Sequence, residues 1–157
     1  MSVLAVYDCM LYFAQASRPE RVRETFDLID NKLVTLFISA EVLAEIRDVL
    51  TRPEYRAKFP ALAPEAVAAF LEDIAARATI VENVAPVYSV ERDLKDSKYV
   101  NLALAAGAEF LVTRDRDLLD LMNESTAEGR DFRNRFPALR IVEPREFVLE
   151  ALRRNPQ

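Results

Sequence analysis

The stretch DLKDSKYVNLALAAGAEFLVTRDRDLL, residues 93–119, predicts an acidic turn, a helix, a buried strand and a second acidic turn. Asp96 and Ser97 are typical of a helix start, because short oxygen-bearing side chains cap free backbone N–H groups. The helix that follows is almost wholly apolar. It is expected to end at Gly107, since glycine readily takes the left-handed conformation found just past a helix. Residues 110–112 then form a short apolar strand.

This helix and this strand together return the chain to its starting edge. A helix of about ten residues runs ~15 Å one way, and a strand of about five residues runs ~16 Å back. We therefore expect Asp96 and Asp115 at the same edge of a sheet, where the strands' carboxyl ends meet and open α/β sheets bind ligands. The alternative is that Asp96 and Asp117 only cap helices, and the acids elsewhere in the chain weigh against it.

The remaining sequence predicts strands that alternate with helices. Apolar runs indicate strands at residues 3–7, 33–38, 79–81 and 140–142, besides residues 110–112. Helical spacing indicates helices over residues 17–31 (with Val22, Phe26 and Ile29 on one face) and 40–51, and further helices that begin near residues 63, 117 and 144. Prolines at positions 53, 60 and 64 are expected to break the second helix and to mark a loop. This alternation predicts an α/β fold with a parallel sheet and right-handed crossovers.

The composition bounds the class of protein. The 157 residues are expected to form one domain, residues 1–157, in which residues 123–137 are an atypical polar insertion, helical in part, and residues 153–157 a frayed tail. Hydrophobic residues make up 51% and charged residues 30%, which is typical of a soluble globular protein. No apolar run reaches the 18 or more residues of a membrane span. One cysteine allows no internal disulfide, which fits the cytoplasm.

The residue types also exclude several chemistries. The chain has no histidine, so it has no serine–histidine triad and no histidine-ligated zinc. Any metal must be held by oxygen, which favours hard cations such as Mg²⁺ or Mn²⁺. A net charge of −5 argues against a protein that coats nucleic acid through a general positive field. It does not exclude a nuclease, because bound cations cancel the charge of an acidic pocket.

Four acids from distant parts of the chain are expected to converge on one edge. Asp8 follows the first strand as Asp115 follows a later one, and Asp96 lies at the same edge. Glu45 falls at the border of its helix's apolar stripe, about a turn and a half beyond a strand end; the alternative is an ordinary boundary glutamate. Carboxylates gathered in this way repel, so protons or one or two divalent cations must join them. Such cations can activate water against a phosphodiester. Asp117 lies close by, although capping its own helix is the slightly favoured use.

These residues carry a resemblance to a known family. The chain resembles the PIN-domain nucleases, in particular the bacterial toxins related to VapC, at residues 3–8, 39–46, 52–53, 93–98, 105–109 and 112–119. The last three motifs are the most specific. The resemblance implies a three-layer α/β/α sandwich around a central, five-stranded parallel sheet. It also implies divalent-metal-dependent RNA cleavage, inhibition by a small antitoxin in toxin members, and a homodimer.

The resemblance also implies roles for single residues. By position, Asp8, Glu45, Asp96 and Asp115 are the catalytic, metal-binding acids. Asp117 is an auxiliary metal ligand, and Thr113 orients the acids. Among the basic residues near the edge, Lys98, Arg114 and Arg116 are candidates to contact RNA phosphates; the alternative is that they are only solvated.

Three departures from the family pattern bear on activity. The opening motif is usually Asp-Thr-Asn, but here it is Asp8-Cys9-Met10, and methionine cannot replace the hydrogen bonds of the amide. Arg114 stands where these toxins often have glycine, so it either contacts phosphate or obstructs the pocket. Residues 123–137 form a longer connection than usual.

Three rival hypotheses follow from the sequence. The first is a PIN fold with weak or no catalysis that acts as a binding or regulatory partner, and Met10 favours it. The second is an Asp-dependent phosphoryl enzyme of the haloacid dehalogenase type, but that group places a second Asp where Met10 stands. The third, a receiver domain, lacks its acidic pair after the first strand.

Overall fold

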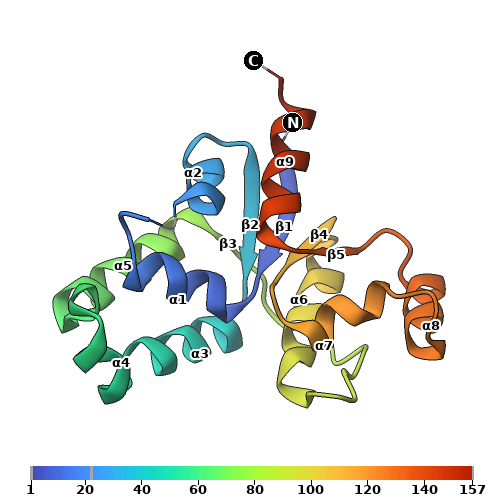
Figure 1. Cartoon of the computed structure of the whole chain (residues 1–157), viewed down its shortest axis with the longest axis horizontal. Coiled ribbons are helices and arrows are strands. Elements are labelled where there is room, and N and C mark those ends of the chain that lie inside the picture. The colour runs from blue at the N-terminus through green and yellow to red at the C-terminus, as the bar shows by residue number, and fades with distance from the viewer. Residues whose placement is uncertain (1, 22, 157) are drawn as a thin grey trace.

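Five parallel strands form one sheet in the computed structural model, which describes residues 2–21 and 23–156. The strands are β1 (Val3–Tyr7), β2 (Val34–Ile38), β3 (Thr79–Ile80), β4 (Phe110–Val112) and β5 (Arg140–Val142), in the spatial order β3-β2-β1-β4-β5 (Figure 1). All four strand pairings are parallel, and Tyr7 of β1 lies opposite Val112 of β4. The five-stranded parallel sheet expected from the sequence is confirmed.

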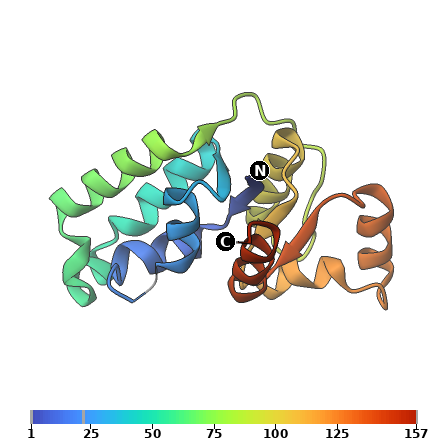
Figure 2. The same cartoon turned by 90° about the horizontal axis from the view of Figure 1, so that it is seen from above.

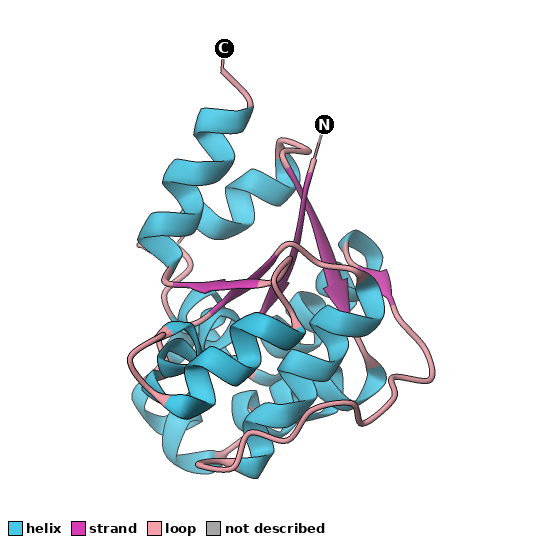
Figure 3. Cartoon of the chain, turned by 90° about the vertical axis from the view of Figure 1, so that its right-hand side faces the viewer, coloured by secondary structure: helices cyan, strands magenta, loops and turns pink. Residues whose placement is uncertain are grey.

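Helices cover both faces of this sheet. They are α1 (Cys9–Ser17), α2 (Glu24–Asp30), α3 (Ala40–Leu50), α4 (Pro53–Lys58), α5 (Pro64–Arg77), α6 (Ser97–Ala106), α7 (Arg116–Leu119), α8 (Ala127–Arg135) and α9 (Pro144–Arg154). Short 3₁₀ turns lie at Pro60–Leu62, Leu94–Asp96 and Asp120–Met122. Helix α6 packs against β1, β2 and β4, and α2 packs against α9. The predicted α/β/α sandwich is confirmed, and Figure 3 shows the sheet between its helices.

The central strand β1 is the core of the molecule. Ala5, Val6 and Tyr7 are fully buried, as expected of a parallel strand covered on both faces. The Tyr7 ring packs edge-on against Phe26 at 5.5 Å and against Phe147 at 5.8 Å between ring centroids. Burial of each such side chain contributes about 1.5–3 kcal/mol. The aromatic contacts fix α2 and α9 onto the sheet and leave its carboxyl edge free.

Helix α1, directly after Asp8, was not expected from the sequence. The prediction placed one helix over residues 17–31, but the chain is helical over Cys9–Ser17 and again only from Glu24. The first segment, CMLYFAQAS, is mostly apolar around its whole circumference, so it gives a weak helical period. The Asp8 carboxylate begins it by accepting hydrogen bonds from two backbone N–H groups. Val22, part of the predicted helix, lies outside the described residues.

Proline and the termini account for two further differences. The helix break expected at Pro53 is confirmed, because α3 ends at Leu50, but Pro53 also occupies the first turn of a new helix, α4, where its missing N–H costs nothing. Residues 123–137 are helical in part, as predicted, and Phe132 of α8 is fully buried against Tyr88. Helix α9 continues through Arg154, so it includes the first two residues of the tail that the sequence predicts to fray. Gln157 lies outside the described residues.

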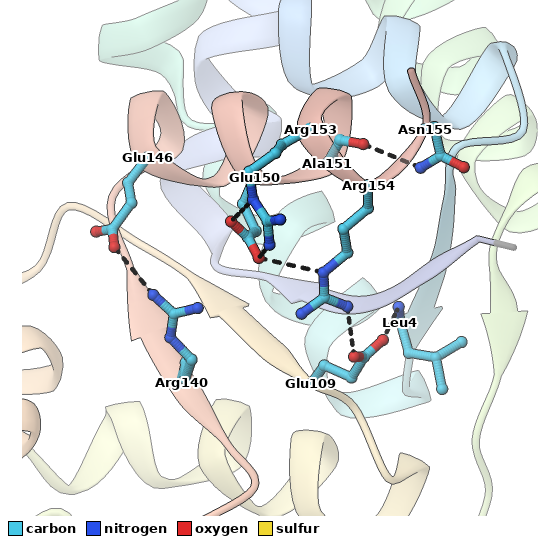
Figure 4. A network of polar contacts seen from close by, with 9 residues as sticks. All are labelled: Leu4, Glu109, Arg140, Glu146, Glu150, Ala151, Arg153, Arg154 and Asn155. Carbon is cyan, nitrogen blue, oxygen red and sulfur yellow. Dashed lines mark hydrogen bonds and ion pairs between the residues drawn. The ribbon is translucent and has the colours of Figure 1, made fainter. Parts of the chain in front are cut away.

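A polar network anchors α9 at the amino edge of the sheet (Figure 4). Glu109, just before β4, accepts a hydrogen bond from the Leu4 N–H of β1 at 3.2 Å. Its other carboxylate oxygen accepts from Arg154 at 2.6 Å, and Arg154 also bonds Glu150 at 3.2 Å. Arg153 bonds the same Glu150 carboxylate at 2.7 Å. The network therefore joins the starts of β1 and β4 to the last turn of α9.

We predict that Glu109→Ala lowers the free energy of unfolding by about 1–2 kcal/mol, because the Leu4 N–H loses its partner. Glu109→Gln should cost only about 0.5 kcal/mol, since the ion pair is partly exposed and the amide oxygen can still accept from Leu4. Urea unfolding at pH 7 measures both values, with Glu82→Gln as a control at an exposed position.

The cost of Glu109→Gln should also depend on pH. Burial alone would raise the Glu109 pKa, but the hydrogen bonds from Arg154 and Leu4 outweigh it, and the pKa is lowered from 4.5. The ion pair therefore stabilises the fold above the unfolded-state pKa and is lost as the pH falls through the folded value. A cost that stays constant down to pH 3 would contradict this account.

Candidate active site

The candidate site lies where the chain stops adding strands on one side of β1 and begins to add them on the other. The chain builds β2 and β3 on one side of β1 and then crosses to build β4 and β5 on the other. The carboxyl ends of β1 and β4 therefore lie at a topological switch point, where α/β folds bind ligands. Figure 2 shows α3, α4 and α5 on one side of the central strand β1 and α6, α7 and α8 on the other. A cleft of about 620 Å³ lies here, lined by five acids: Asp8, Glu45, Asp93, Asp96 and Asp115.

Four aspartates form a compact cluster, and all of them except Asp117 line the cleft. One carboxylate oxygen from each of Asp93, Asp96, Asp115 and Asp117 lies within 4.8 Å of the others. Asp96, Asp115 and Asp117 were sequence candidates, and Asp93 was missed. Asp93 caps the 3₁₀ turn before α6 by accepting from the Lys95 N–H at 3.1 Å. Its position three residues before Asp96 is the signal that could have found it, because a single turn places residues i and i+3 on one side.

Asp96 is the member of the cluster that has a buried carboxylate oxygen without a hydrogen-bond partner in the described part of the chain. Its side chain is 8% exposed, and its Oδ2 atom is buried without a hydrogen-bond partner among the described residues. Burial and then the neighbouring Asp115 raise its pKa from 3.8 to about 8. At neutral pH the cluster therefore favours either a retained proton or a bound cation.

Asp8 is held by hydrogen bonds on the adjoining wall. It accepts from the Met10 N–H at 3.0 Å, from the Leu11 N–H at 3.3 Å and from the Thr113 hydroxyl. Burial raises its pKa to about 6, although these hydrogen bonds lower it in part. The Thr113 oxygen in turn accepts from the Asp115 N–H at 2.9 Å. Thr113 thus connects Asp8 to Asp115, which is the arrangement that an orienting role requires.

Glu45 lines the same cleft but is already paired. Its carboxylate accepts from the Lys98 ammonium at 2.9 Å and from the Tyr99 hydroxyl. The Tyr99 oxygen accepts from the Cys9 N–H at 3.1 Å. The structure therefore brings Asp8 and Glu45 into the cleft as the sequence predicted, but it includes neither in the four-aspartate cluster.

The capping roles differ from those expected. Asp117 was favoured as the cap of its own helix, but Asp115 caps α7 by accepting from the Asp117 N–H at 2.9 Å. The Asp117 carboxylate instead forms an ion pair with Arg92 at 3.0 Å. Asp96 occupies the cap position of α6, but its side chain makes no capping hydrogen bond. The capping alternative is therefore wrong for both residues.

The three basic residues predicted to contact RNA differ in whether they line the cleft. Arg114 is exposed and lines the cleft, together with Lys95. Lys98 is engaged by Glu45, and Arg116 is exposed at the start of α7 without lining the cleft. Met10, the residue that departs from the family motif, is 54% exposed on the cleft wall.

The donor set fits a hard divalent cation. Every ligand in the cluster is a carboxylate oxygen, the type that Mg²⁺ and Mn²⁺ prefer. Among the described residues, Arg92 is the one cation that forms an ion pair with the cluster; it contacts Asp117 there, and its other ion pair is with Asp120 outside the cluster. The unpartnered Asp96 oxygen supplies a free ligand.

Comparisons with known proteins identify the family and the fold of the chain. A family model described as "PIN domain" matches residues 7–117, which include Asp8 and all four clustered aspartates. No curated protein matches the sequence significantly. The solved structures that it resembles include the crystal structure of PAE2754 from Pyrobaculum aerophilum. That likeness has a TM-score of 0.55 and 17% identity over 96% of this chain and 90% of that chain, so it shows the fold alone. Across residues 2–21 and 23–156, no helix is long and apolar enough to cross a membrane.

We predict that Asp96→Asn stabilises the protein in EDTA at pH 8 but not at pH 4. The folded-state pKa of about 8 lies above the ordinary 3.8, so the folded chain binds the proton more tightly and stability falls as the pH rises between these values. Asparagine removes the buried charge. The midpoint of thermal unfolding should rise by roughly 2–4 °C at pH 8 for each kcal/mol gained.

Asp131→Asn, on the surface of α8, removes the same charge and serves as the control. An equal gain for Asp96→Asn at both pH values would mean that repulsion among the carboxylates does not destabilise this site.

Proposed function

Because the chain belongs to the PIN-domain family, a nuclease fold, we propose that it is a divalent-metal-dependent endoribonuclease that hydrolyses RNA phosphodiester bonds. One observation carries this proposal. Asp96 presents a buried, unpartnered carboxylate oxygen inside a cluster of four aspartates, in a cleft at the switch point of the sheet. Such an uncompensated group is typical of a site that binds a cation to function.

The metal ligands follow from the cluster. Asp93, Asp96, Asp115 and Asp117 would hold Mg²⁺ or Mn²⁺. Asp8 and Glu45 would add carboxylates from the cleft wall, as the family resemblance implies. When bound, the metal would supply a Lewis acid at the scissile phosphate.

The chain's own residues have separate tasks in this proposal. Thr113 orients the Asp8 carboxylate by donating to it and holds the Asp115 backbone by accepting from its N–H. Lys95 and Arg114 offer positive charge to the RNA backbone at the cleft. The chain has no histidine to accept a proton, so carboxylates and water are the proton acceptors in this proposal.

We further propose, on the resemblance to VapC-related toxins, that the chain is the toxin component of a toxin–antitoxin pair. A small antitoxin protein would then be its inhibitor, and the active form would be a homodimer. The support for these partners is the set of matching motifs, above all residues 93–98, 105–109 and 112–119.

We predict that the purified protein cleaves a mixed RNA pool with Mn²⁺ or Mg²⁺ and not with EDTA. Asp96→Asn and Asp115→Asn should each lower the rate by roughly 100-fold or more, because each removes a charged ligand. Asp131→Asn is the matched control and should cleave normally.

Asp96→Asn is informative because its fold is expected to be at least as stable as that of the wild type. Loss of activity in this variant therefore cannot be ascribed to unfolding. Cleavage by Asp96→Asn at the wild-type rate would refute the proposed metal site.

The alternative function is a catalytically weak or silent PIN fold that acts as a binding or regulatory partner. The exposed Met10 on the cleft wall favours it, since the family's amide at this position would offer hydrogen bonds that a thioether cannot.

We predict that Met10→Asn increases the cleavage rate several-fold, by restoring an amide that can position substrate or water. Single-turnover cleavage of one RNA by both proteins measures this change. An unchanged rate would mean that the site tolerates methionine. Clean binding of Mn²⁺ without cleavage by either protein would favour the silent alternative.

A further inference from the structure

A second hollow, of about 380 Å³, adjoins the acidic cleft and has the opposite charge. Its walls come from α1, from the segment that enters α2, from the residue after Thr113 and from the start of α9. The cationic side chains that line it are Arg21, Arg23, Arg114 and Arg145, against one acid, Glu24. We call it the arginine hollow.

The four arginines lack the partners that arginines find elsewhere in this protein. None of them forms an ion pair with any residue that the structure describes. On the same α9 helix, by contrast, Arg153 and Arg154 both bind Glu150. The chain has 26 acidic residues against 21 basic ones, so carboxylates are not scarce. Four exposed guanidinium groups without an ion-pair partner among the described residues therefore form, around one hollow, a region of positive charge that attracts anions.

The start of α9 also lies on the wall of the hollow, with the acids Glu143 at its cap position and Glu146 in its first turn. Pro144 and Arg145 begin the helix on the wall of the hollow, and the capping residue Glu143 makes no side-chain hydrogen bond to the helix end. The first N–H groups of this eleven-residue helix are thus left without a side-chain cap. Uncapped helix starts attract anions, and phosphate in particular.

The arginine hollow is continuous with the cleft. Arg114 and Ala14 line both, and Arg114 directly precedes Asp115 of the metal cluster. A flexible polyanion with one phosphate at the aspartates can therefore place its neighbouring phosphates among the arginines. Guanidinium groups suit this task because they bind phosphate oxygens in pairs.

We propose that the arginine hollow binds the backbone phosphates of single-stranded RNA that flank the cleavage site. The proposal rests on the proposed nuclease function, and it assigns the path of the substrate beyond the cleft. It also gives the unusual Arg114 a role, as the residue shared by the metal cleft and the phosphate subsite.

Anisotropy of a fluorescein-labelled, twelve-nucleotide RNA of mixed sequence tests the proposal. Binding is measured in EDTA, which stops cleavage, from 25 to about 200 mM KCl, a range in which phosphate contacts are strongly salt-dependent. Arg23→Gln/Arg145→Gln should lower the affinity roughly 10-fold or more at low salt. It should also reduce the slope of log K against log[salt] by about 1.4, or about 0.7 for each lost contact.

The matched control is Arg56→Gln/Arg130→Gln, which removes the same charge from α4 and α8. Neither of these arginines lines the cleft or the arginine hollow. The control should keep the wild-type slope, and thermal unfolding verifies that both variants are folded. Equal losses in the two variants, a wild-type slope in the hollow variant, or no RNA binding by the wild type would each overturn the proposal.

Cleavage of the same RNA with Mn²⁺ separates this proposal from the nuclease function. Binding that depends on Arg23 and Arg145 without any cleavage would support the subsite and count against the nuclease. Cleavage with wild-type binding by the hollow variant would support the nuclease and overturn the subsite.

Discussion

The register between β1 and β4 is the constraint on which the site depends. Tyr7 lies opposite Val112, and the Asp8 N–H donates to the Val112 carbonyl at 3.1 Å. This register places Asp8 beside Thr113, whose hydroxyl bonds the Asp8 carboxylate while its oxygen accepts from Asp115. A shift of one residue would turn Thr113 to the opposite face and separate the two acids. The position of the carboxylates is therefore set by the backbone pairing of two strands.

The two edges of the same strand pair differ in how their carboxylates are compensated. At the amino edge, Glu109 is paired with Arg154 and with the Leu4 N–H, and this compensation lowers its pKa. At the carboxyl edge, Asp96 is buried beside Asp115, and its pKa is raised. The amino edge and the aromatic core around Tyr7 therefore stabilise the register, while the carboxyl edge stores repulsion. Functional sites commonly carry such a local cost, which the rest of the fold offsets.

Much of this architecture was predictable from the sequence, for identifiable reasons. The strands and the helices α3, α5 and α6 carry clear periods and caps, and Gly107 ends α6 with a φ of 64° as expected. Helix α1 was not predicted because a segment that is apolar all round has no clear helical period. Helix α4 was not predicted because the proline in its first turn resembles one that ends a helix. Asp93 was missed because its place in the cluster depends on a 3₁₀ turn. The arginine hollow could not be predicted, since Arg21 and Arg145 meet only through the packing of α2 against α9.

The hydrogen-bond and ion-pair partners of each acid indicate how readily it would bind a cation. The Glu45 charge is compensated by Lys98, and the Tyr99 hydroxyl that bonds Glu45 also accepts from the Cys9 N–H at the start of α1. Each Glu45 oxygen already accepts a hydrogen bond and Lys98 compensates the charge, so a cation gains less from Glu45 than from an uncompensated carboxylate. Asp96 has no ion pair or hydrogen bond among the described residues to break at its free oxygen, and only the proton that its raised pKa favours has to leave. A cation entering this cleft therefore gains most from the aspartate cluster. Glu45 becomes a stronger ligand when Lys98 pairs with another anion, and a phosphate of the incoming RNA chain is one that the proposed reaction supplies.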